Sequence, residues 1–423
     1  MPRLPGVETQ TGAVAHVDMD CFYAACERLR EPRLRGEPVV VGMGYEPGET
    51  HGAVATASYE ARAQGVESAM AISAALELVP RCRDRSKSDD GAGSADAEGE
   101  VDGATDDEDR SCGFYRPVDM SYYESVSQEV QAVCASYAET LRVVSIDEAY
   151  LDFGDVDFET AADIGRELKA EIESEAGVVP SVGIAPNMAT AKLASDAEKP
   201  DGFVVVPPTE VRSFLAPLPV EDLHGVGPVT ARELRGMGLE TAGDVAAATE
   251  PELVDAFGER GRELHAQARG VDPREVEPRG RPKSLSSESA FHEPTADVER
   301  KRTLIRELAT EVTQRAATQN ALYKTIGVKV VQPPFDVSTR ERSLSGPIDD
   351  PELVESIACE LLEEFEEVSV RKLGVRVSNL SFDDRKQAQL ATFEGDADGS
   401  EDGGARSTGR QSGGQTDLTE FSE

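Results

Sequence analysis

Three carboxylates stand beside short apolar runs that are typical of buried strands. The run of residues 13–17 stops at Asp18, and Asp147 and Glu148 lie between two further strand-like runs. If these strands are adjacent and antiparallel, the three side chains meet at one point, which is costly unless cations neutralise them. Oxygen ligands suit Mg²⁺, and a pair of such ions activates an attacking hydroxyl and stabilises a leaving pyrophosphate. The pattern predicts phosphoryl-transfer chemistry, although any one of these acids alone would fit a solvated surface in an acid-rich chain.

The segments around these acids predict alternating helices and strands. Residues 21–30 have helical spacing, residues 38–42 predict a strand, and residues 52–66 predict a strand of small residues that turns into a helix. Residues 114–140 predict one amphipathic helix. Two more helices are expected at the positions 298–318 and 351–366. This alternation indicates an α/β or α+β core.

The bulk composition sets limits on the partners. The chain of 423 residues is long enough for several domains, and its formal charge is −38. So acidic a chain normally repels DNA. However, the absent Trp, the low aromatic content and the pervasive acids are typical of a cytosolic protein adapted to molar salt, where the Debye length falls to about 3 Å and local basic patches decide binding. No signal pattern and no stretch of about 18 apolar residues is present, so a soluble cytoplasmic protein is expected.

One acidic segment and the cysteines complete the composition. Residues 84–111 are predicted to be a disordered insertion, because Asp84 to Arg110 carry 11 acidic and 3 basic residues and almost no large apolar group. The six cysteines form no CxxC pair and no zinc-spaced cluster, so they are predicted to be reduced and mostly buried thiols. They are Cys21, Cys26, Cys82, Cys112, Cys134 and Cys359.

Four longer motifs follow one another along the chain: HVDMDCFYAACE, GAVATASYEARAQGVESAM, SIDEAYLDF and AKLASDAEKPDG. Together they closely resemble Y-family polymerases of the DNA polymerase IV (DinB) type, over roughly residues 13–383 apart from the acidic insertion. The resemblance implies a multidomain α+β protein shaped as a right hand, with an α/β palm, small fingers, a helical thumb and an α/β little finger. It also implies low-fidelity, template-directed DNA synthesis without proofreading, including synthesis past lesions.

The resemblance assigns metal-binding roles to residues of two motifs. It implies that Asp18 and Asp147 bind both of two Mg²⁺ ions, and that the carbonyl of Met19 adds a ligand. Glu148, the residue often assigned as catalytic in the family, completes the site. Asp20 has the strand parity of Asp18, but the family pattern does not make it a principal ligand.

Further roles concern the incoming nucleotide. Tyr23 falls on the family's steric-gate position, where a bulky ring under the incoming sugar rejects a 2′-hydroxyl. Without the motif, Tyr23 would fit equally a tyrosine packed in a core. The matches to the family's triphosphate contacts are Tyr59, Arg62 and Lys199, with Thr56 a weaker match. Tyrosine, arginine and lysine supply the mixture of donors that a polyphosphate favours.

Two regions predict contacts with a DNA backbone. Gly225, Gly227 and the helix that follows predict a helix-hairpin-helix, whose exposed amides hold a phosphate irrespective of sequence, although an ordinary Gly-rich connection is the alternative. This region resembles the family's thumb. Residues 279–345 carry 12 basic and 8 acidic residues, a net of +4. In the motif RKLGVRVSNL, Lys372 and Arg376 fall on the face opposite the apolar residues, which resembles the DNA-facing sheet of the little finger.

The last residues keep the spacing Q-x-x-L-x-x-F of a sliding-clamp-binding peptide. The residues are Gln415, Leu418 and Phe421, and Ser422 stands where a second aromatic is usual. The expected partners are therefore primer-template DNA, deoxynucleoside triphosphates and a sliding clamp, with no membrane, and the chain is expected to be a monomer. The expected domains are a palm (1–21 and 112–206), fingers (22–83), thumb (207–278), little finger (279–383) and a disordered tail (384–423).

Two other functions compete with a DNA polymerase. A catalytically inactive Y-family-like protein that docks DNA or a clamp has no reason to keep Asp18, Asp147, Glu148 and Tyr23 together. A nucleotide cyclase has no duplex to hold, and so has no use for a helix-hairpin-helix and a basic C-terminal domain. The sequence therefore favours a polymerase.

Overall fold

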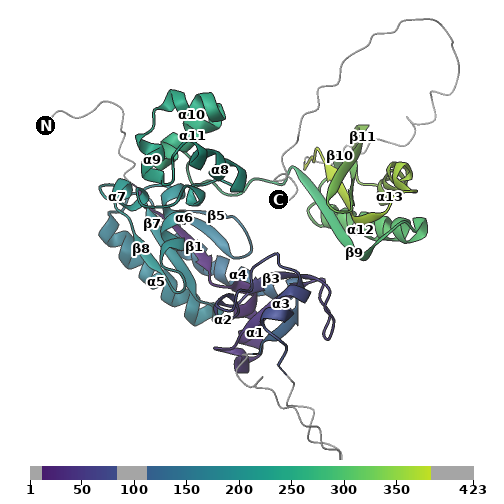
Figure 1. Cartoon of the computed structure of the whole chain (residues 1–423), viewed down its shortest axis with the longest axis horizontal. Coiled ribbons are helices and arrows are strands. Elements are labelled where there is room, and N and C mark those ends of the chain that lie inside the picture. Colours follow the sequence, from purple (N-terminus) through teal and green to yellow (C-terminus); the bar gives the residue numbers. More distant parts are fainter. Residues whose placement is uncertain (1–11, 83–111, 383–423) are drawn as a thin grey trace, which may run out of the picture. The chain divides into compact units, whose positions relative to one another are not determined.

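The computed structural model describes residues 12–82 and 112–382 (Figure 1). The chain divides into two compact units, Met1–Gly280 and Arg281–Glu423. The second unit begins two residues after the start predicted for the little finger. The predicted acidic insertion (84–111) and tail (384–423), with Gln415, Leu418 and Phe421, lie outside the described residues. Within the described part, no helix is both long and apolar enough to cross a membrane.

The palm is a five-stranded sheet with helices on both faces. Its strands run in the order β5 (Thr140–Val143), β6 (Glu148–Asp152), β1 (Val14–Met19), β7 (Pro180–Ala185) and β8 (Phe203–Val205). One face packs against α4 (Met120–Tyr137) and α5 (Phe158–Ala176), which share its apolar core. On the other face, α6 (Met188–Ala197) lies over β1 and β7, and Ser195 hydrogen bonds to the buried His16 at 2.8 Å. Burial lowers the pKa of His16 to about 3, so this ring is neutral and structural.

The fingers contain a small three-stranded sheet, β3 (Ala53–Ala57), β2 (Val39–Met43) and β4 (Phe114–Pro117). Around it lie α1 (Phe22–Arg30), η1 (Pro32–Leu34), α2 (Tyr59–Arg62) and α3 (Ile72–Leu78). The single helix predicted over 114–140 is wrong at its start. Residues 114–117 form β4, which pairs in parallel with β2, and thus belong to the fingers sheet rather than to the palm sheet. The helix begins only after Pro117, where Asp119 caps it by accepting from the N–H of Tyr122.

The predicted reduction of all six cysteines is also wrong. Cys82 and Cys112 form a disulfide across 30 residues of sequence, at the two ends of the acidic insertion. The N–H of Cys82 bonds to the carbonyl of Gly113, and the N–H of Gly113 bonds to that of Pro80, so backbone pairing brings the two cysteines together. The other four cysteines are free, and three of these are buried.

The thumb is entirely helical. It contains α7 (Val211–Leu215), η3 (Val220–Asp222), α8 (Pro228–Gly236), α9 (Ala242–Ala247), α10 (Glu250–Phe257) and α11 (Glu259–Ala268). The predicted helix-hairpin-helix is confirmed: Gly227 precedes α8, Pro228 opens it, and Gly225 has a φ of 77° that favours glycine. Capping boxes at Thr241 and Thr249 begin α9 and α10.

The second unit, which corresponds to the predicted little finger, has its sheet on one side and two helices on the other. The strand order is β11 (Asp336–Ile348), β10 (Tyr323–Gln332), β12 (Val370–Ser378) and β9 (Ser284–Thr295). The helices are α12 (Val298–Thr318), as predicted, and α13 (Pro351–Leu362), which η4 (Glu363–Phe365) extends. The apolar residues of β12 pack with both helices, so the predicted parity of this strand is confirmed.

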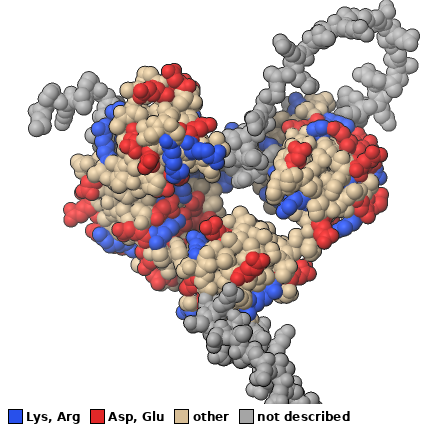
Figure 2. All heavy atoms as spheres, in the orientation of Figure 1, with Lys and Arg blue, Asp and Glu red and all other residues tan. Residues whose placement is uncertain are grey.

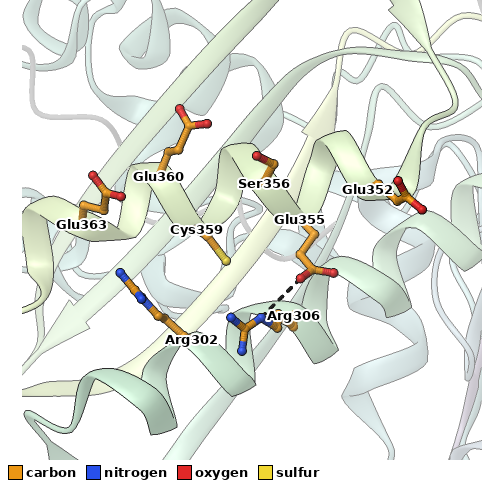
Figure 3. Close-up of a pocket in the computed structure, with 8 residues that line it drawn as sticks. All are labelled: Arg302, Arg306, Glu352, Glu355, Ser356, Cys359, Glu360 and Glu363. Atoms are coloured by element: carbon orange, nitrogen blue, oxygen red, sulfur yellow. Dashed lines mark ion pairs between the residues drawn. The ribbon is translucent and has the colours of Figure 1, made fainter.

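An open pocket of about 490 Å³ lies between α12 and α13 (Figure 3). Its charged side chains come from both helices and include an ion pair of 3.3 Å between Arg306 and Glu355. None of the residues predicted to bind metal, nucleotide or DNA lines it.

Candidate active site

The palm sheet places two of the predicted carboxylates side by side. In the antiparallel pair of β1 and β6, Asp18 stands directly opposite Glu148. Opposite residues of an antiparallel pair share a face of the sheet, so both side chains point toward α6. Met19 ends β1, and its N–H donates to the carbonyl of Asp147 at 3.0 Å, which fixes this register at the strand ends.

Two lysines neutralise these carboxylates. Lys199 Nζ lies 2.7 Å from Asp18 Oδ2, and Lys192 Nζ lies 2.6 Å from Glu148 Oε1. Asp196 accepts from Lys199 at 2.8 Å and so helps to hold it. Lys199 was predicted to contact a triphosphate, whereas Lys192 was missed. The signal for Lys192 was its i,i+4 spacing to Asp196, which puts both on the face of α6 that covers the acids.

The pKa values show how unfavourable the pair of acids is without a cation. Burial raises the pKa of Asp18 to about 7, and the charge of Glu148 adds to this rise against the opposing effect of Lys199. Burial also acts to raise the pKa of Glu148, but its hydrogen bond and charge interaction with Lys192 outweigh burial and lower the pKa. The site is therefore built to hold positive charge against Asp18 and Glu148.

Asp147 is held away from this pair. Its Oδ1 accepts from Ser145 Oγ at 2.5 Å, and the same Oγ accepts from the N–H of Glu148 at 3.1 Å. Within residues 12–82 and 112–382, no group of three or more acidic, histidine or cysteine side chains is arranged to hold a metal ion. The predicted cluster of three carboxylates is thus not assembled in this structure. The donor set nevertheless fits a divalent cation, because it consists of oxygens and already attracts two ammonium groups.

Tyr23 is fixed by aromatic packing. The turn between β1 and α1 passes through Cys21, whose φ of 48° lies in the left-handed region. Tyr23 follows in the first turn of α1 and stacks on Tyr123 of α4, with ring centroids 4.6 Å apart and an interplanar angle of 16°. The hydroxyl of Tyr123, a fully buried residue, donates to Glu27 at 2.8 Å. Half-buried Tyr23 therefore presents its ring from a rigid support.

Asp20 joins the fingers to the palm. Its carboxylate accepts from the hydroxyl of Tyr59 at 3.0 Å, from Ser181 at 2.9 Å and from the N–H of Asp201 at 2.6 Å. These bonds use both of its oxygens and explain why Asp20 stands so near Asp18 without facing the two lysines. Arg62, predicted to contact a triphosphate, instead bonds to the carbonyl of Ala57 at 2.9 Å.

The other predicted nucleotide contact, Thr56, lies in β3 opposite Val41. No contact in the described residues connects Thr56 to Asp18 or Glu148. Its predicted role has no structural support beyond its place in the fingers sheet.

A pocket lies between the helix-hairpin-helix and the palm. A pocket of about 230 Å³ is lined by Tyr150 and Lys192 from the palm and by His224, Gly225 and Arg274 from the thumb. Lys192 thus borders both the Glu148 carboxylate and the thumb hairpin, while Gly227 marks the exposed start of α8. The predicted DNA-binding residues Lys372 and Arg376 lie in the second unit, on the sheet face away from its helices.

Comparisons with known proteins agree along the chain. Residues 17–196 match the impB/mucB/samB family, residues 208–239 match the HHH motif of the same IMS family, and residues 282–391 match the family's C-terminal domain. The chain is 57% identical to a DNA polymerase IV of Halobacterium salinarum, over 99% of this chain and 98% of that protein. It is 38% identical to a DNA polymerase IV of Methanoculleus marisnigri, over 91% of this chain and 99% of that protein.

Solved structures are similar over most of the chain. The structure described as "Y-family DNA polymerase chimera Dbh-Dpo4(243-245)-Dbh" is similar with a TM-score of 0.74 and 28% identity, covering 88% of this chain and all of that one. DinB from Sulfolobus solfataricus is similar with a TM-score of 0.57 and 27% identity, over 88% of this chain and all of that one. The predicted right-hand fold is confirmed, and the chain belongs to the Y family of DNA polymerases, among those of the DNA polymerase IV type.

Proposed function

We propose that this chain is a template-directed DNA polymerase that adds deoxynucleotides to a primer 3′-hydroxyl, releases pyrophosphate and copies past lesions. The observation that carries the proposal is that Asp18 and Glu148 lie opposite each other on neighbouring strands and that each forms an ion pair with a lysine. Relatives named DNA polymerase IV align with this chain over nearly its whole length, these residues included. Within residues 12–82 and 112–382, the palm, fingers, thumb and second unit leave no further block that could house a proofreading exonuclease, and we expect low fidelity.

The acids would hold divalent metal ions. Asp18, Asp147 and Glu148, with the carbonyl of Met19, would bind two Mg²⁺ ions once Asp147 leaves Ser145 and the lysines leave the carboxylates. Bound there, such ions supply an activated hydroxyl and charge stabilisation for a leaving pyrophosphate. Lys192, the ion-pair partner of Glu148, lines the pocket beside the thumb hairpin, and the primer end would arrive from that side.

The neighbouring cations would bind the nucleotide. Lys199 and Lys192, when released from Asp18 and Glu148, would offer positive charge to a triphosphate, and Arg62 and Tyr59 would offer directed hydrogen bonds from the fingers. Thr56 would add a weaker contact. Tyr23 would lie under the sugar and reject a 2′-hydroxyl by its bulk, because Tyr123 prevents its ring from retreating.

Two regions would hold the primer-template duplex without reading its sequence. The amides around Gly225 and Gly227 would bind a phosphate at the start of α8, and Lys372 and Arg376 would contact the backbone from the little-finger sheet. Gln415, Leu418 and Phe421 would bind a sliding clamp, and we expect the polymerase itself to be a monomer.

Primer extension tests the proposal. The protein would be assayed on a primed template with Mg²⁺ and deoxynucleotides, at low and high KCl, beside Asp147→Ala and Glu148→Ala. We expect extension by the native protein and none by either variant. Extension that survives both substitutions would refute the metal site, and absence of extension at every salt concentration would leave only a DNA-docking protein.

A further inference from the structure

The fully buried imidazole of His16 lies on the same face of the palm sheet as the paired carboxylates. On this face, His16 stands opposite Tyr150 of β6 and opposite Gly183 of β7. A β-carbon at Gly183 would collide with the backbone of Ala191 and Ser195, so the missing side chain lets α6 pack directly against β7. The ring of His16 is therefore enclosed between the sheet and α6.

Two successive hydrogen bonds fix which nitrogen of this ring carries the proton. The hydroxyl of Ser195 donates its single proton to the carbonyl of Lys192 at 2.7 Å, so it accepts from Nδ1 of His16 at 2.8 Å. Because burial keeps the ring neutral, Nε2 has a lone pair and no proton. Within residues 12–82 and 112–382, this buried Nε2 atom has no hydrogen-bond partner, which is unfavourable.

The same hydrogen bonds place the ring beside the base of the Lys192 side chain. Ser195 links His16 to the backbone of Lys192, whose ammonium group reaches 2.6 Å from a carboxylate oxygen of Glu148. Tyr150, whose ring centroid lies 4.6 Å from that of His16, lines the same pocket as Lys192. After burial, the charge of Lys192 has the largest effect on the pKa of His16. The lysine therefore extends from the region of the imidazole toward the carboxylate.

A divalent cation bound to Glu148 would repel the ammonium group of Lys192 and take the oxygen that this group now occupies. The displaced group then needs another acceptor. Asp196 Oδ2 lies 4.0 Å from it, but Asp196 already binds Lys199 at 2.8 Å. We propose that His16 is a positioning residue, whose Nε2 receives the ammonium group of Lys192 when a divalent cation displaces that group from Glu148. This inference rests on the proposed function in taking Mg²⁺ as the cation.

The exchange separates the roles of the two lysines. Lys199 becomes available for hydrogen bonds with a triphosphate, whereas Lys192, held by His16, acts on the triphosphate only through its charge. The neutral ring accepts the ammonium group without adding a negative charge that would compete for the cation. Without this acceptor, Lys192 would stay closer to Glu148 and oppose cation binding there.

Nitrogen NMR of isotopically labelled histidine tests the proposal, and the chain has only five histidines to assign. MgCl2 is added without DNA or nucleotide, and KCl of the same ionic strength serves as the control. We expect Mg²⁺ to shift the resonance of His16 Nε2 to higher field, as happens when an imidazole lone pair accepts a hydrogen bond, while Nδ1 stays protonated. The shift should be absent in Lys192→Gln and present in Lys199→Gln, which removes the other lysine of the site.

Cation affinity gives a second measurement. His16→Asn keeps a donor for Ser195 but has no atom at the position of Nε2, whereas Ser195→Ala keeps Nε2. Mn²⁺ binding is followed by the paramagnetic resonance of the free ion, and the part that Asp18→Asn abolishes is compared. We expect affinity to fall about tenfold in His16→Asn and much less in Ser195→Ala. In a Lys192→Gln background, His16→Asn should have no effect.

The outcomes separate this role of His16 from support of the fold. An unchanged Nε2 resonance in the native protein, or an equal loss of Mn²⁺ affinity with and without Lys192, would overturn the proposal. Primer extension is measured separately. If extension fails while the Nε2 shift appears, the polymerase proposal falls and the exchange between Glu148 and His16 stands, because the titrations contain neither DNA nor nucleotide.

Discussion

The ring of Tyr23 depends on a buried carboxylate one helical turn away. Glu27 accepts a hydrogen bond from the hydroxyl of Tyr123, and Tyr123 stacks on Tyr23. Glu27 and Tyr123 therefore together support the ring of Tyr23. Burial raises the pKa of Tyr123 well above its usual range, and the hydrogen bond to Glu27 adds to this effect. The support therefore stays hydrogen bonded across the neutral pH range.

Substitution of this support should change sugar selection. Tyr23→Ala should raise incorporation of ribonucleotides by at least about tenfold, since a contact of about 1.4 kcal/mol is lost from the discrimination. Tyr123→Phe keeps the stacked ring but leaves Glu27 without its donor, and should lower selectivity less while lowering the free energy of unfolding by about 1–3 kcal/mol. The ratio of kcat/KM for deoxynucleotide and ribonucleotide measures the effect.

A neighbouring tyrosine provides the control. Tyr122 donates its hydroxyl to the carbonyl of Cys26 at 3.3 Å and does not stack on Tyr23. Tyr122→Phe should leave the selectivity ratio unchanged. An unchanged ratio in Tyr123→Phe as well would show that the hydrogen bond to Glu27 has no part in placing the ring.

At this scale the sequence predicted strand ends better than side-chain partners. The apolar run before Asp18 and the runs around Glu148 predicted β1 and β6, and their register places the two acids side by side. The hydrogen bond from Ser145 to Asp147 could not be predicted, because it depends on the side-chain rotamers of two residues in the turn before β6. Nor could the three bonds of Asp20, whose partners lie between 39 and 181 residues away.

At the scale of elements, the base of the thumb is anchored to the first turn of α6. The side chain of Asn187 donates to the carbonyl of Gly270 at 3.0 Å, and Asp272 accepts from the N–H of Ala189 at 3.1 Å. Arg274 also binds Asp272, at 2.8 Å. Because α6 carries Lys192 and Asp196, this anchor ties the position of the thumb to the helix that covers the acids.

Removal of the negative charge of Asp272 should lower the free energy of unfolding of the first unit. Burial acts to raise the pKa of Asp272, but Arg274 outweighs burial and lowers it. A lowered folded pKa means that the carboxylate stabilises the fold above its ordinary pKa of about 3.9, and that this stabilisation is lost as pH falls through the lower folded value. Asp272→Asn should therefore cost about 2 kcal/mol at neutral pH and progressively less below about pH 4.

Chemical denaturation at several pH values measures this difference. Asp255→Asn, at an exposed position of α10, removes the same charge from the thumb and should have little effect at any pH. A cost that is the same for both substitutions, or one that grows in acid, would contradict the role given to Asp272.

Among the elements, regular apolar periodicity predicted the helices well, whereas strand pairing and the effect of proline are not visible in that periodicity. Helix α12 spans the predicted residues 298–318, because its apolar spacing is unbroken. The predicted helix over 114–140 failed at residues 114–117, where pairing with β2 and the missing N–H of Pro117 favour a strand. The disulfide was missed because a separation of 30 residues carries no signal in sequence.

At the scale of the whole molecule, acidic and basic side chains are interspersed on both units (Figure 2). Many form ion pairs, such as Arg340 with Glu364 and Arg342 with Glu360 in the second unit. A net charge of −38 is therefore compatible with local basic faces, and in concentrated salt the distant acids are screened. Binding to DNA should therefore depend on these local basic faces and not on the net charge of the chain.

The predicted clamp-binding peptide can be tested by truncation. Deletion of residues 415–423 should abolish stimulation of synthesis by a sliding clamp and leave basal extension unchanged, because Gln415, Leu418 and Phe421 lie far along the chain from every palm residue. Extension with and without clamp provides the measurement. Equal stimulation of the full-length and shortened proteins would refute the prediction.

Reduction of the Cys82–Cys112 bond should destabilise the fold. A crosslink that closes a loop of this length contributes about 3–4 kcal/mol by restricting the unfolded chain. A reductant, or Cys82→Ser, should lower the melting temperature by several degrees. Cys359→Ser, at a free cysteine, should remain responsive to the reductant like the native protein. A melting temperature indifferent to reductant would count against the crosslink.

Because of the same crosslink, the backbone is only one of two covalent connections between α3 and β4, the two parts of the fingers on either side of the insertion. A protease that cuts between residues 83 and 111, at Arg85 or Lys87 for example, would leave one molecule, and its two pieces would separate on a gel only after reduction. New chain ends could thus be opened there, or a foreign sequence inserted, without releasing β4 from its partner strand.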